Sequence, residues 1–402
     1  MILPLFPTVL EHYKENDANG YYEKVANTTQ RLGHFIGSPQ GQSETVLIGG
    51  ILGSVFCFLQ FISAPLIGAF SDLKGRRQAL LICLVGIATS HVLWYNASTF
   101  LVFILSRIIG GLARANVSLS TAIVADDCTA DERPKGMAMI GGAFSIGFVV
   151  GPAIGAYFST SGDYSSAAVS CVSLSAISLS VVYLFLPETL PTKDRVKVKD
   201  LQSISTYLSP RSLFSFKAVS VGQNLKPIGI SYFIYIFIYS GLEFTLTFLT
   251  HYKFKYTPMD QGKMFAAMGL GMALLQGTLV RRLTPAMEDS AAKIGMLIMI
   301  PAFAIIGYSQ DSSQLALGLF CYCIGSGVVT PCLTSMTAAR VTKPSEKGVA
   351  LGIFRSLGAL ARAFGPLSAS ALFWRIGPSQ AYLCGALTFV IPLYFLSRAT
   401  KN

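Results

Sequence analysis

The sequence predicts an all-α membrane protein in which two bundles of six helices stand side by side in the membrane. Hydrophobic residues make up 52% of the 402 residues and charged residues only 13%, a balance that soluble domains of this length rarely show. The apolar residues gather into long segments, most of them close to the length that a helix needs to cross ~30 Å of hydrocarbon. Short motifs of the first half recur in the second half, which is typical of membrane carriers built from paired bundles.

The first apolar segment, residues 1–10, has only half the length of a spanning helix. We interpret it as the second half of a first helix whose beginning is missing. A polar loop is expected from Glu11 to Ser43. About eleven complete transmembrane helices are then predicted, at residues 45–67, 78–95, 100–124, 137–158, 165–186, 227–250, 263–280, 294–308, 314–338, 349–373 and 380–397.

The lysine and arginine residues orient these helices. Of the 31, the predicted inner loops hold 20 and the predicted outer loops 7, which places the carboxyl terminus in the cytoplasm. The same bias accounts for the net charge of +11, so no nucleic-acid partner is expected. It also places Asn27, in the acceptor pattern Asn27-Thr28-Thr29, outside the cytoplasm, where N-glycosylation is expected.

An internal repeat divides the chain. The motif at residues 135–138 (Lys-Gly-Met-Ala) recurs at 347–350 (Lys-Gly-Val-Ala), 212 positions later, and each opens a predicted helix. A Gly-Pro pair at 151–152 recurs at 365–366. The repeat predicts an N-terminal helical bundle at residues 1–190, a cytoplasmic linker at 191–226 and a C-terminal helical bundle at 227–402.

The loop between the second and third predicted helices carries a regular pattern of glycine and charge. It reads Gly68-x-x-x-Asp72-x-x-Gly75-Arg76-Arg77. The pattern resembles the loop signature of the major facilitator superfamily. Longer strings, among them residues 116–126 and 355–362, resemble an animal subfamily of tetracycline transporter-like carriers. The resemblance implies the superfamily's transporter fold, efflux of organic anions, and a place in the plasma membrane or an intracellular membrane, the nuclear envelope included.

The charged residues of this loop are expected to form a gate. Asp72 can face the positive amino end of a neighbouring helix, and Arg76 or Arg77 can pair with Asp126 at the inner end of the fourth span. Such contacts hold the two bundles together in one state and break in the other, so they gate the protein without touching substrate.

A second candidate for movement is marked by Gly147, Gly151 and Pro152. Glycines recur about every four residues from Gly142 to Gly155, which gives a flat helix face along which another helix can slide, and Pro152 permits bending. The stretch resembles the fifth-helix signature of proton antiporters in the same superfamily. Ordinary packing of small residues is the alternative.

Four arginines are expected inside the membrane. Arg107 and Arg114 are seven residues apart, as are Arg355 and Arg362, so each pair should share a helix face. The only acidic residue deep in a span is Glu243, which leaves an interior excess of three positive charges. A cavity with this charge would repel cations, so the substrate is expected to be a small organic anion. Alternatively, some of these arginines bond backbone carbonyls or reach an interface.

Glu243 is the natural proton carrier, because burial favours its protonated form while a nearby guanidinium favours the carboxylate. A static ion pair is the alternative. Tyr235 and Tyr239, together with Tyr232, recur near helical spacing in the same span and could stack on an aromatic ligand. Such a stripe also arises from simple packing.

These features favour a monomeric secondary active transporter of small organic anions, drug-like ones included. It would work in the lipid bilayer by alternating access, with efflux coupled to protons or counter-anions. The alternatives are a transporter-like receptor or scaffold, and a carrier of cationic or neutral drugs. The sequence contains no Ser/His/Asp set, phosphate-binding glycine loop or metal-ligand cluster, so no enzyme activity, metal or cofactor is expected.

Overall fold

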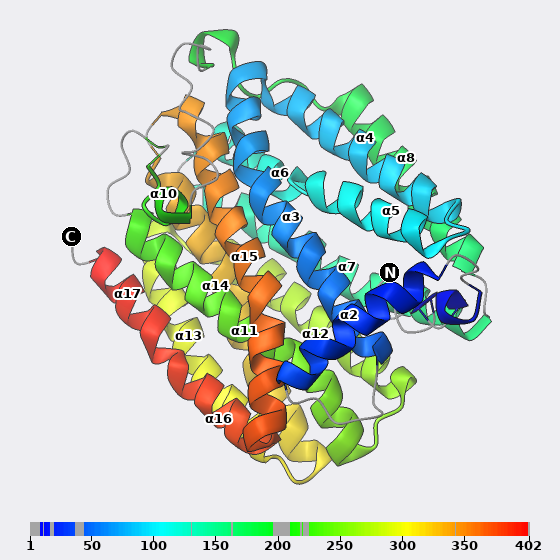
Figure 1. Ribbon diagram of the computed structural model, residues 1–402. Helices are drawn as coiled ribbons and strands as arrows, with labels where there is room; N and C mark the ends of the chain where they lie inside the picture. The colour runs from blue at the N-terminus through cyan, green and yellow to red at the C-terminus, as the bar shows by residue number, and fades with distance from the viewer. Residues whose placement is uncertain are drawn as a thin grey trace.

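Helices account for almost all of the described structure. The computed structural model describes residues 9–10, 12–16, 20–36, 44–129, 131–161, 164–195, 210–217, 219, 225–341 and 343–400. The main helices are α2 (Tyr21–Ile36), α3 (Glu44–Lys74), α4 (Arg76–Tyr95), α5 (Phe100–Leu112), α6 (Asn116–Asp127), α7 (Arg133–Ser161), α8 (Tyr164–Phe185), α10 (Pro210–Phe214), α11 (Leu225–Phe254), α12 (Pro258–Thr278), α13 (Pro285–Tyr308), α14 (Ser312–Ala339), α15 (Pro344–Ile376), α16 (Pro378–Thr388) and α17 (Val390–Thr400) (Figure 1).

Within these residues, nine helical stretches are long and apolar enough to cross a membrane. They correspond to nine of the eleven predicted spans. The other two predicted spans are also helical, as α7 and α15. Arg355 and Arg362 interrupt the apolar sequence of α15. This helix is therefore long enough to cross a membrane but is not among the nine apolar stretches.

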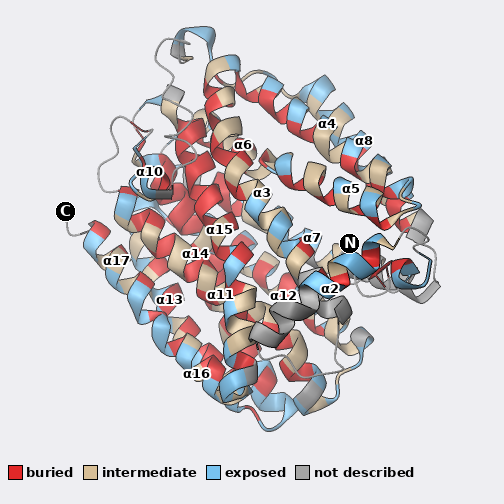
Figure 2. Cartoon of the chain, viewed as in Figure 1, coloured by how far each residue is buried: buried red, intermediate tan, exposed pale blue. Residues whose placement is uncertain are grey.

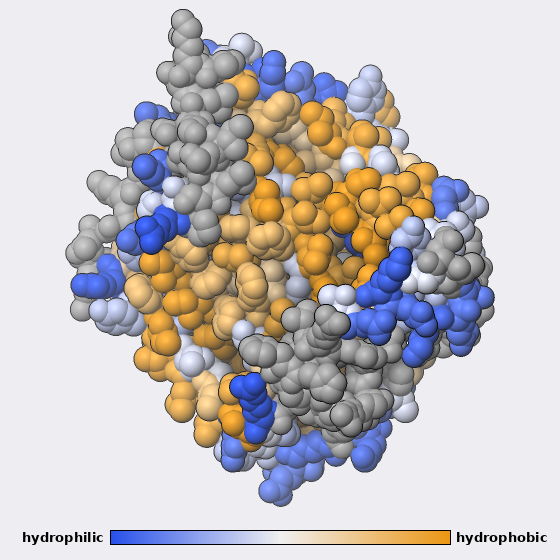
Figure 3. All heavy atoms as spheres, in the orientation of Figure 1, coloured by the Kyte–Doolittle hydropathy of each residue, from blue (hydrophilic) through white to orange (hydrophobic). Residues whose placement is uncertain are grey.

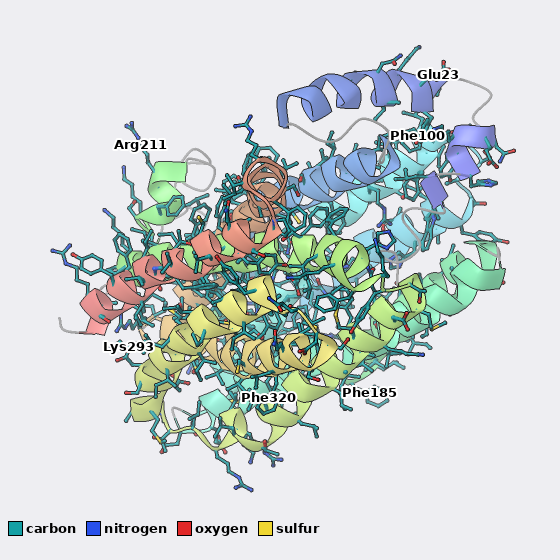
Figure 4. The ribbon with its side chains drawn as sticks, turned by 90° about the horizontal axis from the view of Figure 1, so that it is seen from below. Glu23, Phe100, Phe185, Arg211, Lys293 and Phe320 are labelled. Atoms are coloured by element: carbon teal, nitrogen blue, oxygen red, sulfur yellow. The ribbon has the colours of Figure 1, made fainter. Side chains whose placement is uncertain are left out.

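The outer surface is apolar over a broad band. Hydrophobic residues cover the middle of the face in Figure 3, and hydrophilic residues gather toward its margins. Phe185 on α8 and Phe320 on α14 are 76% and 64% exposed and lie on the outside of the helix bundle (Figure 4). Such large exposed apolar side chains are stable against lipid and would be costly in water.

The interior is organised around α15, which runs beside α3 on one side and α11 on the other (Figure 1). Buried residues concentrate on α14 and α15, whereas α4 and α8 carry many exposed ones (Figure 2). Two buried clusters draw only on residues 9–186, and the largest cluster draws mainly on residues 213–399. The predicted bundle boundaries at 190 and 227 agree with this grouping and stay a prediction.

Part of the predicted linker packs as core. Phe216 is buried at a positive φ of 51°. Its ring fills the space that a side chain at Gly229 on α11 would take, and Leu357 of α15 lines the same space. Residues 196–209 of the linker lie outside the described residues.

The predicted loop at residues 11–43 is wrong where the structure describes it. The chain is helical at 12–16 and again in α2. Tyr22 and Ala26, one turn apart, are buried, and Tyr22 packs against Phe100. A few apolar residues at helical spacing are enough to dock a polar helix, and the excess of polar residues concealed that spacing.

The predicted fourth span is broken. It forms α5 and α6, with a turn at residues 113–115 between them. The turn follows a Gly-Gly pair, and a side chain at Gly111 would lie 3.0 Å from the carbonyl oxygen of Phe56 on α3. Glycine weakens a helix and permits this close approach. Arg114 lies in this turn and Arg107 is within electrostatic range of it, so the expectation that the two share one helix face stays a prediction.

Candidate substrate cavity and cytoplasmic gate

Two of the predicted arginines are exposed although protein surrounds them. Arg114, in the turn between α5 and α6, and Arg362, on α15, both keep exposed side chains deep among protein atoms. Cys57 on α3 lies within electrostatic range of both guanidinium groups. Because both side chains are exposed and share Cys57 as an electrostatic neighbour, we infer that these residues from the two halves of the chain face a common interior cavity.

The other side of the cavity is polar and aromatic. The phenol groups of Tyr239 and Tyr322 donate hydrogen bonds to Oε1 of Glu243, at 3.1 and 3.3 Å. The two phenol rings stack with their centroids 5.5 Å apart. Arg362 is within electrostatic range of Glu243. Glu243 is therefore near an arginine, as predicted, but its carboxylate makes its hydrogen bonds with the two phenols and not with the guanidinium.

Tyr235 serves packing in this structure. It is buried between Tyr239 and Phe389, with ring centroids 5.8 and 5.9 Å away. Tyr232 is likewise buried and stacks on Phe354 at 3.9 Å. Of the three tyrosines in the predicted stripe, only Tyr239 is half-buried, although all three lie within electrostatic range of Arg362.

Arg355 lies on α15, seven residues before Arg362. It is half-buried beside Tyr232 and within electrostatic range of Arg362. Its Nε atom has no hydrogen-bond partner among the described residues. The next residue, Ser356, donates a hydrogen bond of 2.6 Å to the carbonyl oxygen of Phe61 on α3. Arg355 therefore sits where the cavity ends and the contact between α3 and α15 begins.

Arg107 has different packing neighbours from this group, although Arg114 is within electrostatic range of it. It is only 8% exposed and lies between the rings of Trp94 and Phe103, within residues 76–112. In the described part of the chain, none of the four arginines forms an ion pair with a carboxylate. In the described residues, the positive charges of these four arginines are therefore not balanced by direct ion pairs with acidic side chains.

Asp72 joins α3 to α15 at the end of these helices that the sequence predicts to be cytoplasmic. Its two carboxylate oxygens accept hydrogen bonds from the backbone N–H groups of Gly348 and Val349, at 2.9 and 2.6 Å. These groups lie near the amino end of α15, where the helix dipole favours a negative charge. The sequence interpretation expected Asp72 to face a helix amino end in this way.

Arg76 is fully buried between two acids. It pairs with Asp72, and its Nε donates to Oδ2 of Asp126 at 2.8 Å. Lys347 reaches across from α15, with Nζ 3.4 Å from Oδ1 of Asp126 and 2.7 Å from the carbonyl oxygen of Ala125. Two acids and two bases thus link α3, α4, α6 and α15 in one buried network, which we call the cytoplasmic latch.

The helices of the latch are in very close contact. A side chain at Gly68 would lie 2.5 Å from the carbonyl oxygen of Gly348, and one at Gly352 would lie 2.7 Å from that of Ala64. Only glycine allows backbones to approach so closely. Together with the bond from Ser356 to Phe61, these contacts seal α3 against α15 over the inner half of both helices.

Arg77 and Gly75 support the latch from outside it. Arg77 donates a hydrogen bond of 2.6 Å to the carbonyl oxygen of Tyr183 on α8. Glu188 accepts from the backbone N–H groups of Arg76 and Arg77, at 2.8 and 3.3 Å, and so caps α4. Gly75 precedes α4 with φ +112°, and any side chain there would collide with Glu188.

The glycine face predicted on α7 is only partly realised. Gly142 and Gly147 face open space, and the close contact with α12 is made by Gly141, where a side chain would lie 3.0 Å from Gln276. Gly151 is half-buried and the helix continues through Pro152, whose side chain lies outside the described residues. Asn27 is exposed on α2, and its glycosylation stays a prediction.

Several site residues were missed from the sequence. Tyr322 and Cys57 both sit in apolar spans, with no polar pattern around them that would mark a site. Lys347 and Gly348 had a usable signal, since they belong to the repeated Lys-Gly motif. By itself the motif indicates a repeat, and nothing in it shows which residues its lysine contacts.

Comparison with known proteins identifies the family. The model of the Major Facilitator Superfamily matches residues 1–366. Human major facilitator superfamily domain-containing protein 10 is 41% identical over 99% of this chain and 89% of its own length. The class B tetracycline resistance protein of Escherichia coli is 24% identical over 93% of this chain and 84% of its own length.

Solved structures give the same result. The crystal structure of the human organic anion transporter MFSD10 (TETRAN) covers 98% of this chain and 94% of its own, with a TM-score of 0.92 and 40% identity. The proton:xylose symporter XylE, at 18% identity and a TM-score of 0.68, shares the fold. These likenesses and the apolar helices make the protein an integral multi-pass membrane transporter. The chain belongs to the Major Facilitator Superfamily.

Proposed function

We propose that the protein carries small organic anions across its membrane by alternating access. The observation that carries this proposal is the pair Arg114 and Arg362, one from each half of the chain, exposed in an interior cavity without a carboxylate partner among the described residues. Two guanidinium groups that face one interior space create a positive potential there, and an anionic substrate supplies the counter-charge. The human relative of known structure is named an organic anion transporter, which supports the same substrate class.

The cavity residues suggest how such an anion is held. A guanidinium binds a carboxylate or sulfonate through two parallel hydrogen bonds. Phe56 lies 5.8 Å from the Arg114 guanidinium, and the stacked pair Tyr239 and Tyr322 stands beside Glu243 near Arg362. We infer a substrate with one acidic group between the two arginines and an apolar or aromatic body against these rings.

The latch and the cavity define one state of the transport cycle. The cytoplasmic latch holds α3, α4 and α6 to α15, while the arginines of the cavity remain exposed. We infer a state that is closed toward the cytoplasm and open to the other side. Transport then requires the latch to break as the halves rock around the bound anion.

Binding and transport can be measured separately. Cys57 is within electrostatic range of both arginines, so an anion bound to them should shield its thiol from an alkylating reagent. We expect an aromatic carboxylate to slow alkylation of Cys57, followed by mass spectrometry, and to be taken up by vesicles that contain the purified protein. Protection of Cys57 without uptake would identify a receptor. Neither protection nor uptake by any aromatic anion would exclude the proposed substrate class.

Glu243 is the proposed coupling residue. Replacing Glu243 with Gln keeps the shape and an acceptor for the phenols of Tyr239 and Tyr322 but removes the titratable group. We expect exchange of anions across vesicles to continue and the acceleration by a pH gradient to disappear, because no proton is carried. Anion flux with and without a gradient is the measurement.

Tyr322→Phe is the matched control, since it removes one hydrogen bond and leaves the carboxylate. It should retain the response to the pH gradient. An unchanged pH response in Glu243→Gln would remove Glu243 from the coupling mechanism. Loss of both flux and Cys57 protection in that variant would instead show that Glu243 holds the cavity together as a static partner of Arg362.

A further inference from the structure

Arg107 is a buried cation that nothing in the described chain neutralises. Its side chain is 92% buried. Its Nε is 3.5 Å from Oγ of Ser106, and its two terminal nitrogens form no hydrogen bond with any residue that the structure describes. The terminal nitrogens still touch accessible space, because they are absent from the fully enclosed polar atoms that lack a partner.

The surroundings of Arg107 come from three helices of the N-terminal half. The ring centroids of Trp94 on α4 and Phe103 on α5 lie 5.9 and 5.6 Å from its guanidinium carbon. His91 is within electrostatic range, and its Nδ1 lies 2.7 Å from Oγ of Ser175 on α8. The space between α4, α5 and α8 is thus closed by rings and small polar groups.

The neighbouring hydroxyl protons are already engaged. The hydroxyl of Ser106 donates to the carbonyl oxygen of Phe103 at 2.7 Å, and that of Ser175 donates to the carbonyl oxygen of Cys171 at 2.8 Å. Aromatic faces return only part of the free energy that a guanidinium loses when it is buried. A further partner with a negative charge would offset the remainder.

We propose that Arg107 holds a small monovalent inorganic anion, such as chloride, between α4, α5 and α8, where the nearby Arg114 guanidinium adds positive potential. A halide matches the single positive charge and accepts hydrogen bonds from the free guanidinium N–H groups without donating any. The two flanking rings and the near-complete burial leave no room for an aromatic substrate. The proposal does not rest on the proposed function, because it concerns residues of one half of the chain.

Trp94 allows a direct test. The chain has two tryptophans, so Trp374→Phe leaves Trp94 as the only one. Iodide quenches indole fluorescence on contact. In this full-length variant, iodide is added in place of an equal concentration of gluconate, so that the ionic strength stays constant during the titration. We expect saturable quenching of Trp94 that chloride reverses in competition with iodide.

Arg107→Gln should abolish the saturable phase or weaken it about tenfold or more, because one charge-assisted partner is lost. Arg375→Gln, at the far end of α15, removes the same charge away from the site and should leave the phase unchanged. Quenching that rises linearly without saturation, or saturation equal in Arg107→Gln, would overturn the proposal and leave water as the partner. If Arg107→Gln fails to fold, competition in the protein that retains Arg107 decides, since iodide quenching that chloride does not reverse also overturns it.

Discussion

Replacing Arg362 with Gln should reduce organic-anion transport at least about tenfold, because the variant loses the charged, two-pronged contact that we propose for the substrate. A hydrogen bond to a charged group contributes about 1.5–3 kcal/mol, which corresponds to roughly ten- to a hundredfold in affinity. Arg362 is exposed in the cavity and forms no ion pair with a described carboxylate, so the fold should tolerate the change. The measurement is uptake by vesicles as a function of anion concentration.

Arg375→Gln is the matched control for this experiment. It lies on the same helix, in the last turn and exposed, and its loss changes the total charge by the same amount. Transport should be within about twofold of the unmodified protein in this control. Protection of Cys57 by the anion should also be lost in Arg362→Gln. A variant that transports normally while protection persists would show that the anion does not bind Arg362.

Replacing Asp72 with Asn should open the cytoplasmic side. The change removes the charge that pairs with buried Arg76 and weakens the acceptor for the backbone N–H groups of Gly348 and Val349. Breaking a buried ion pair costs about 3–5 kcal/mol, enough to shift a two-state equilibrium by roughly a hundredfold or more. We expect Cys57 to become reactive toward a membrane-impermeant thiol reagent added from the cytoplasmic side.

Asp289→Asn provides the comparison. Asp289 pairs with Lys293 at 2.5 Å within α13, near the cytoplasmic end, and does not connect the two halves of the chain. It should leave the reactivity of Cys57 unchanged. If Asp72→Asn also left it unchanged, in protein that still binds the anion, the latch would be a structural contact and the cytoplasmic gate would have to be sought elsewhere.

The spans and the charge inventory could be read directly from the chain. Nine of eleven predicted spans coincide with apolar helical stretches, because a bilayer imposes the same length and composition on every one. The partner of Arg76 was also within reach, since a buried guanidinium needs an acid and Asp126 ends the neighbouring span. The break between α5 and α6 could not be predicted from the sequence, because a glycine pair permits a turn without requiring one.

The sequence by itself determined that this protein is helical and lies in a membrane, and that its interior holds more arginine than acid. These properties follow from composition and spacing, which do not depend on how helices meet. Only the tertiary structure decided which arginines share a space. Arg114 and Arg362 face one cavity while Arg107 is enclosed by aromatic rings, because backbone approaches such as those of Gly68 to Gly348 and Gly111 to Phe56 fix the helix positions. Contacts between residues far apart in the chain leave no periodic trace in either segment.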